Sequence, residues 1–238
     1  MKKIMFDDRF GLTQAVLGGS KTMTRRIEKS LQKIDFEILE MHYDYPSGTF
    51  IIYKKEPVIF GGEKFHDHIQ IRPRFTMGEC VVVAQRYSDL SMDDMIAKFY
   101  GSVLDRFTQE QLIRQHQGWN NKMYVMADLM PHWIQITDIR LQRLQDITDE
   151  DCLCEGIEED DPYYWVPTNY DIPDWKKINE KVSDMYQGVR DRKPTPHFWD
   201  SPRKAFAALI NFMSPKVDGL PVWDLNPYVF AYTFKLIK

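Results

Sequence analysis

The sequence has 238 residues, of which 43% are hydrophobic and 28% are charged, and its formal net charge is -4. That length can bury a sizeable core without disulfides, and at about 150 residues per domain it corresponds to one enlarged domain or two small ones. Lysine and arginine total 31 against 35 for aspartate and glutamate, which excludes a strongly basic nucleic-acid coat protein.

The N-terminal third is predicted to form a strand, a short helix and a basic loop. Residues 2–6 favour a strand, and residues 10–17 place apolar side chains on one helical face. Gly18-Gly19 ends this helix, because glycine readily adopts the left-handed conformation found at helix ends. The prolines and glycines within residues 41–75 predict short strands and loops there.

The middle of the chain alternates between strand and helix patterns. Residues 78–87 are β-branched and follow a turn, which favours a strand, whereas residues 91–117 have helical spacing. Residues 123–144 return to a strand pattern, but their apolar side chains change face near Thr137-Asp138. A change of face of this kind predicts a β-bulge.

A short helix over residues 148–155 has clear end signals. Thr148 is a good N-cap, and Gly156 is suited to end the helix. The run from Asp146 to Asp161 holds nine acids and no lysine or arginine, and we expect it to leave the helix as a solvated loop. Two further helices are expected, over residues 175–186 and 203–213.

The last segment, residues 226–237, alternates between an aromatic face and a mixed face. This pattern suits a strand that closes a barrel against a hydrophobic interior. Together with the helices, it predicts an α+β protein.

The N-terminus and the cysteines favour a cytoplasmic protein. The first acids, Asp7 and Asp8, come too early for a signal-peptide core, and no stretch approaches the roughly 20 apolar residues that cross a bilayer. Cys80, Cys152 and Cys154 cannot all pair with one another, which favours a reducing compartment. We therefore expect no membrane partner.

A local basic patch contrasts with the negative net charge. Residues 21–33 contain five lysines or arginines and one acid, a local charge of +4. Lys21, Arg25 and Arg26 can present one ammonium and two guanidiniums to a single ligand, and guanidiniums bind phosphate and carboxylate groups well. The alternative is an ordinary solvated basic loop.

Three sequence blocks occur in an order that resembles the ASCH-domain family, a branch of the PUA-like superfamily. The first is Gly19-x-Lys21-Thr22-x-Thr24-x-Arg26, the second runs from Asp138 to Glu155-Gly156, and the third is Trp223-Asp224-x-Asn226-Pro227. The chain is most similar in style to the longer bacterial and phage-associated members. The resemblance implies a small mixed β-barrel with flanking helices. It also implies a single domain over residues 1–238, with insertions near 36–75, 88–120 and 158–203.

The same resemblance implies a cleft beside the basic loop that binds RNA or a modified nucleoside. The ligand-binding residues are then Gly19, Thr22, Arg25 and Arg26. A compact branch of the family removes the acetyl group from N4-acetylcytidine with a lysine, a threonine and a glutamate. These three fall on Lys21, Thr24 and Glu155 here. This chain is much longer, and its extra segments can reshape the cleft, so amide hydrolysis is the alternative to binding.

The three residues implied as catalytic suit the chemistry of amide hydrolysis. Thr24 can attack the acyl carbonyl, and Lys21 can accept its proton if burial lowers the lysine pKa. Glu155 falls in the last helical turn, where the negative end of the dipole raises a carboxylate pKa and suits a proton shuttle.

Each of these roles has a structural alternative. Thr24 can hydrogen-bond a turn, and Glu155 can pair with Arg25 or Arg26. A third function is a non-catalytic protein-interaction module, with the acidic exit loop and the aromatic clusters at residues 163–165 and 197–199 as its surface. His66-Asp67-His68 fits a surface turn and has no identifiable third ligand, so we expect no metal and no cofactor.

Overall fold

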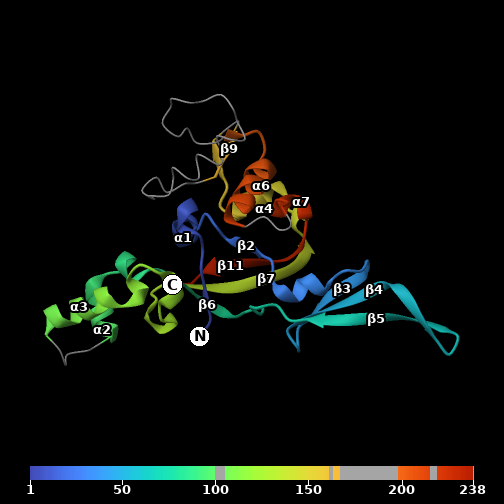
Figure 1. Cartoon of the computed structure of the whole chain (residues 1–238), viewed down its shortest axis with the longest axis horizontal. Helices are drawn as coiled ribbons and strands as arrows, with labels where there is room; N and C mark the ends of the chain where they lie inside the picture. The colour runs from blue at the N-terminus through green and yellow to red at the C-terminus, as the bar shows by residue number, and fades with distance from the viewer. Residues whose placement is uncertain (100–104, 161–162, 167–197, 215–218, 238) are drawn as a thin grey trace.

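The computed structural model describes residues 1–99, 105–160, 163–166, 198–214 and 219–237, which form a mixed α+β fold (Figure 1). The strands are β1 Lys3–Ile4, β2 Met23–Arg26, β3 Ile38–Asp44, β4 Thr49–Phe60, β5 Glu63–Ile71, β6 Cys80–Val83, β7 Trp133–Arg143, β8 Glu158–Asp160, β9 Tyr163–Trp165, β10 Phe198–Trp199 and β11 Tyr228–Leu236. The α-helices are α1 Leu12–Leu17, α2 Met92–Phe99, α3 Arg106–Gln115, α4 Asp149–Cys154, α6 Pro202–Met213 and α7 Val222–Leu225. The predicted α+β class is confirmed.

The central sheet has the strand order β1-β6-β7-β11-β2. The β1–β6 pair is parallel and the other pairs are antiparallel. The two end strands do not pair; instead the Arg26 side chain donates a hydrogen bond from Nη2 to the Met5 carbonyl at 2.7 Å. The described strands of the central sheet therefore form an open sheet. The expectation that the last strand closes a barrel was wrong. The two-residue β1 is too short to extend a hydrogen-bonded ladder to β2.

The predicted bulge lies in β7. Thr233 of β11 pairs with Asp138, and the next residue, Phe234, pairs with Ile136, so Thr137 is the additional residue. The shift allows Ile136 and Ile139, which are three positions apart, to be buried together. The prediction from the change of face is confirmed.

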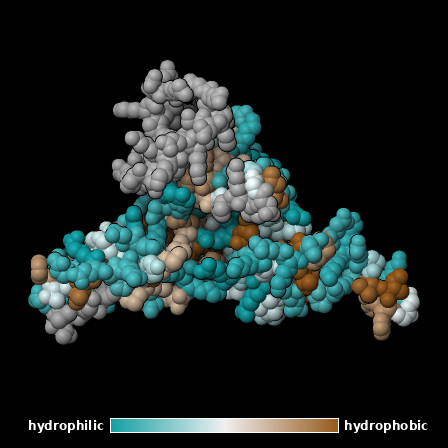
Figure 2. Space-filling model, viewed as in Figure 1, coloured by the Kyte–Doolittle hydropathy of each residue, from teal (hydrophilic) through white to brown (hydrophobic). Residues whose placement is uncertain are grey.

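A second sheet, with the order β3-β4-β5, forms one wing of the molecule (Figure 1). Its inner end packs on the main core through Phe50, Ile52 and Ile71. Its outer end is a two-stranded ribbon with exposed apolar side chains, visible at the far right of Figure 2; these are Val58, Ile59, Phe60 and Phe65. The expectation of short strands and loops was wrong, because β4 and β5 are 12 and 9 residues long. His66 and His68 lie within β5 rather than in a surface turn.

The opposite wing contains α2 and α3, which confirms the helical prediction for residues 91–117 where the structure describes them (Figure 1). A smaller hydrophobic cluster joins this wing to β6, and it includes Val82, Tyr87, Met95 and Ile113. The two wings lie within the segments near residues 36–75 and 88–120 that the resemblance implies to be insertions.

Above the central sheet, α4 and α6 pack together (Figure 1). Thr148 caps α4 by accepting a hydrogen bond from the Asp151 N–H, and Gly156 follows with a φ of 98°, as predicted. The helix expected over residues 203–213 is α6, whereas the helix expected over residues 175–186 lies outside the described residues.

The acidic segment that leaves α4 differs from its prediction. Glu158–Asp160 form β8, which pairs with β9, so this part of the run is a strand and not a solvated loop. Tyr164 and Trp199, from the two predicted aromatic clusters, pack against the main core. Tyr164 and Trp199 therefore anchor their strands to the core, which leaves these two rings less available to a partner.

Two absences apply to the described part of the chain. None of its helices combines the length and apolar character that a membrane span needs. It also contains no group of three or more histidine, cysteine or acidic side chains placed to hold a metal ion.

Candidate functional site

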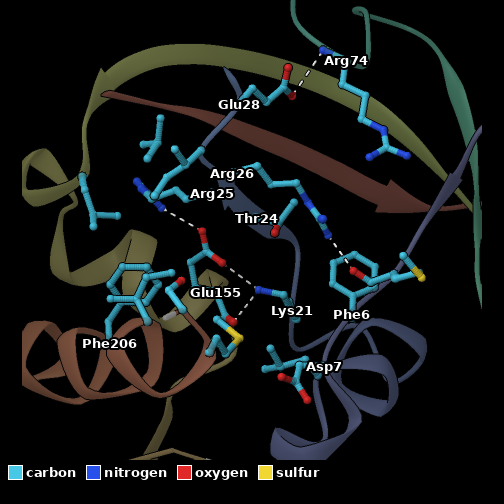
Figure 3. Close-up of a pocket in the computed structure, with 18 residues that line it drawn as sticks. Phe6, Asp7, Lys21, Thr24, Arg25, Arg26, Glu28, Arg74, Glu155 and Phe206 are labelled. Atoms are coloured by element: carbon cyan, nitrogen blue, oxygen red, sulfur yellow. Dashed lines mark hydrogen bonds and ion pairs between the residues drawn. The ribbon is translucent and has the colours of Figure 1, made fainter. Parts of the chain in front are cut away.

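A cavity of about 360 Å³ lies between β2, the ends of α4 and α6, and the N-terminal segment (Figure 3). It is lined by Met5, Phe6, Asp7, Leu12, Lys21, Thr24, Arg25, Arg26, Ile27, Glu28, Arg74, Leu144, Glu155, Phe206, Ile210, Met213, Ser214 and Val229. Its size falls at the lower end of the range for small-molecule sites. Charged groups and apolar walls face the same space.

The backbone before β2 is held in place by hydrogen bonds to three other elements. The Lys21 N–H donates to the Ala15 carbonyl of α1 at 3.0 Å, and the Thr22 N–H donates to the Cys154 carbonyl of α4 at 2.9 Å. The Thr22 carbonyl accepts from the Phe234 N–H of β11 at 2.8 Å. The predicted basic loop is therefore a strand from Met23 onward, because its backbone completes the edge of the central sheet.

Lys21 and Glu155 form the centre of the site (Figure 3). The Lys21 Nζ donates to the Glu155 Oε2 at 2.7 Å and to the Glu155 carbonyl at 2.6 Å. The two side chains are only 2% and 5% exposed. A buried ion pair of this kind is well satisfied on both sides, and removal of either partner leaves an uncompensated charge.

Arg25 ties the same carboxylate to a second acid. Its Nη1 donates to the Glu155 Oε1 at 3.2 Å, and its Nη2 pairs with Asp151. Asp151 also accepts from the Arg140 Nη2 at 3.0 Å. The acids of α4 thus neutralise the buried part of the basic patch, which excludes the alternative of a purely solvated loop.

Burial sets the pKa of the lysine. Desolvation is the largest influence and lowers the pKa of Lys21 below its ordinary value; Glu155 opposes this, and the charges of Arg26 and Arg25 add to it. The net direction is downward. The pair therefore holds a lysine that gives up its proton more easily than a lysine in water.

Gly156 makes room for this lysine. Its φ of 98° lies in a region that side-chain-bearing residues rarely adopt. A Cβ at this position would lie 3.4 Å from the Leu12 Cδ2 and 3.6 Å from both the Cβ and the Cδ of Lys21. The predicted helix stop therefore also packs against the lysine of the site.

The structure brings together five of the seven predicted site residues. Lys21, Thr24, Arg25, Arg26 and Glu155 all line the cavity, and Thr24 is 6% exposed with its hydroxyl directed into the site in Figure 3. The other two do not line it. Gly19 ends the α1 turn with a φ of 80°, and Thr22 contributes backbone hydrogen bonds, so their roles here are structural.

Sequence reasoning missed several residues of the site. The Phe6 ring lies under two cations, with its centroid 5.9 Å from the Lys21 Nζ and 5.8 Å from the Arg26 Cζ. Glu28 accepts from the Tyr232 hydroxyl at 2.8 Å and from the Arg74 N–H at 3.3 Å. Only Asp151 had a usable signal, because it stands four positions before Glu155 and so shares its helix face.

A scan against protein-family models matches no family, and searches of curated proteins and of solved structures return no match. The motifs and the geometry of the cavity are therefore the basis for the functional proposal.

Proposed function

We propose that this protein binds a modified nucleoside in the cavity beside Lys21. The observation that carries the proposal is the convergence of Lys21, Thr24, Arg25, Arg26 and Glu155 on one cavity of about 360 Å³. Four of these residues come from the first sequence block of the ASCH resemblance, and Glu155 comes from the second. The two blocks are far apart in the sequence, and the fold brings them together.

The cavity has the two features that a nucleoside requires. Phe6, Phe206 and Val229 provide apolar surface for the faces of a base. The Arg26 guanidinium provides donors for its polar edge, and the Thr24 hydroxyl can donate or accept there. The volume accommodates one nucleoside and not a run of stacked bases, so a longer RNA would place a single unstacked base in the cavity.

Binding can be tested by calorimetric titration with N4-acetylcytidine, cytidine and uridine. The proposal predicts one-to-one binding with a dissociation constant below about 1 mM, in the range of ordinary enzyme substrates. A Met213→Trp variant provides the control, because Met213 is a partly buried residue of the cavity wall and a larger ring there occupies ligand space. Affinity unchanged by Met213→Trp contradicts binding at this site.

A second candidate function, amide hydrolysis, is favoured by the Lys21–Glu155 pair beside a threonine hydroxyl. A lysine with a lowered pKa can pass its proton to Glu155 and then act as the base for Thr24. The Thr24 oxygen would form a bond to the acyl carbon, and the C–N bond would break as the leaving amine takes up the proton. Water would then release the acyl group from Thr24 as a carboxylic acid.

The two threonines of the motif give a matched pair for testing hydrolysis. Thr24→Val removes a hydroxyl that faces the cavity, and Thr22→Val removes one from a residue outside it. Release of acetate from N4-acetylcytidine should be lost in the first variant and retained in the second. If the wild type binds the nucleoside but releases no acetate, hydrolysis is wrong and binding stands.

A further inference from the structure

Two arginines of the cavity have no acidic partner. Arg26 and Arg74 both line it, and Figure 3 shows their guanidinium groups on the same side, away from Glu155. Within the described part of the chain, neither guanidinium forms an ion pair with a carboxylate. Two neighbouring guanidinium groups that no carboxylate pairs with directly can form a site for an anion.

The acids of the cavity are already engaged elsewhere. Glu155 pairs with Lys21 and Arg25. Asp7 lies 2.6 Å from the Arg9 Nη2. Glu155 and Asp7 are therefore neutralised by cations other than Arg26 and Arg74.

Glu28, the remaining acid, is held by neutral groups. It accepts hydrogen bonds from the Tyr232 hydroxyl and the Arg74 backbone N–H. Its single charge leaves Arg26 and Arg74 with one positive charge in excess.

Arg26 also has a donor without a partner. Its Nη2 bonds to the Met5 carbonyl at 2.7 Å, which fixes the guanidinium, but its Nε is buried and has no hydrogen-bond partner. Desolvation and then the charge of Arg74 lower the pKa of Arg26. A buried N–H of a charged group is costly to leave unpaired, but this Nε is closed to solvent, so a ligand in the cavity would meet the Nη groups of Arg26 instead.

We propose that Arg26 and Arg74 form a phosphate subsite, so that a nucleoside phosphate binds more tightly than the uncharged nucleoside. The inference rests on the proposed function for the base, but the anion subsite can be measured separately. Guanidiniums bind phosphate oxygens with paired, directional hydrogen bonds. A phosphate monoester carries a charge of about −1.5 to −2 at neutral pH, enough to offset the excess positive charge.

The test compares cytidine with its 5′- and 3′-monophosphates by calorimetric titration at fixed salt. We expect one of the two monophosphates to bind at least about tenfold more tightly than cytidine, as one or two charge-assisted hydrogen bonds would give. The difference between the 5′ and 3′ compounds identifies which end of the sugar faces Arg74. Inorganic phosphate alone is titrated as a separate arm.

Arg72 and Arg74 provide a matched pair of variants. Both are exposed, but only Arg74 lines the cavity, so neither change to alanine should impair folding. Arg74→Ala should abolish the preference for the phosphate, measured in that variant as the ratio of the affinities for the monophosphate and for cytidine. Arg72→Ala should leave both affinities unchanged, and Arg74→Lys should retain part of the preference.

The outcomes distinguish the subsite from the function on which it rests. Equal affinity for cytidine and both monophosphates overturns the phosphate subsite and leaves the nucleoside proposal intact. Binding of inorganic phosphate that depends on Arg74, without any binding of nucleoside, supports the subsite and overturns the nucleoside proposal. A phosphate preference that Arg74→Ala does not reduce also overturns the subsite.

Discussion

Lys21 and Glu155 are 134 positions apart in the chain, and their side chains meet at 2.7 Å in a buried ion pair. The contact joins the segment before β2 to the end of α4, and Arg25 adds a second link to the same carboxylate. The pair lies in the wall of the cavity, so the structure of the site and its chemistry depend on the same atoms.

Replacement of Glu155 should destabilise the fold strongly. Glu155→Gln leaves Lys21 and Arg25 buried with like charges and no shared carboxylate, at a cost of roughly 3–5 kcal/mol in the free energy of unfolding. Urea denaturation followed by circular dichroism measures the change.

An exposed pair with the same geometry is the control for that experiment. Lys55 and Glu37 also lie 2.7 Å apart, but their side chains are 60% and 73% exposed. Glu37→Gln should leave the free energy of unfolding nearly unchanged, because solvent screens the pair. Equal changes in the free energy of unfolding for the two substitutions would show that burial of the Glu155 pair contributes nothing to stability.

Asp151 should make the protein sensitive to acid. Burial opposes its ionisation, but hydrogen bonds from Arg140 and Arg25 outweigh this and hold the pKa of Asp151 below its ordinary value. The unfolded chain therefore binds more protons than the native one at low pH, so the contribution of Asp151 is complete above about pH 4 and is lost as the pH falls further.

Asp151→Asn tests this pH dependence. The variant should be less stable than the wild type at pH 7, and its stability should decline less between pH 5 and pH 2. Urea denaturation at a series of pH values measures both. A variant with the same acid dependence as the wild type would rule out this role of Asp151.

Cys152 should make the protein sensitive to alkali. Burial raises the pKa of the Cys152 thiol to about 12. Above pH 9 the unfolded chain loses this proton while the native chain keeps it, so the free energy of unfolding falls by up to about 1.4 kcal/mol per pH unit. Cys152→Ala should decline less steeply between pH 9 and pH 11. Rapid labelling of native Cys152 by a thiol reagent at pH 8 would contradict the burial on which this depends.

Gly156 should not tolerate a side chain. Gly156→Ala forces a left-handed backbone and places a methyl group against Leu12 and Lys21, and we expect a loss of about 1–2 kcal/mol in stability. Gly62→Ala is a useful control, because its φ of 86° is close to the 98° of Gly156 but no atom lies within 4 Å of the added Cβ. The contacts of a Cβ at Gly156, at 3.4–3.6 Å, are ordinary van der Waals contacts, so the two variants should lose similar stability, and a much larger loss at Gly156 would contradict backbone strain as the cause.

Short-range sequence patterns predicted the structural features that depend only on neighbouring residues. The change of face at Thr137, the cap at Thr148 and the stop at Gly156 each depend on a few neighbouring residues, and all three are confirmed. The length of β4 and β5 was not predicted, because the outer half of β4 exposes three successive apolar residues and that of β5 has only Phe65, so no clean alternation marks either strand.

The site itself was predicted in part. The motif residues Lys21, Thr24 and Glu155 were identified through the ASCH resemblance, but their contacts depend on packing between distant segments. Arg74 had no sequence signal, because its position in the cavity follows from the path of the chain after β5. Residue type indicates which chemistry is available, and only the tertiary fold determines which groups share a cavity.

Binding of a base-bearing ligand in this cavity is best measured by titrating the wild type and Met213→Trp with N4-acetylcytidine. We expect one-to-one binding to the wild type with a dissociation constant below about 1 mM and at least a tenfold loss of affinity in the variant. No binding to the wild type, or equal binding to both proteins, would contradict it.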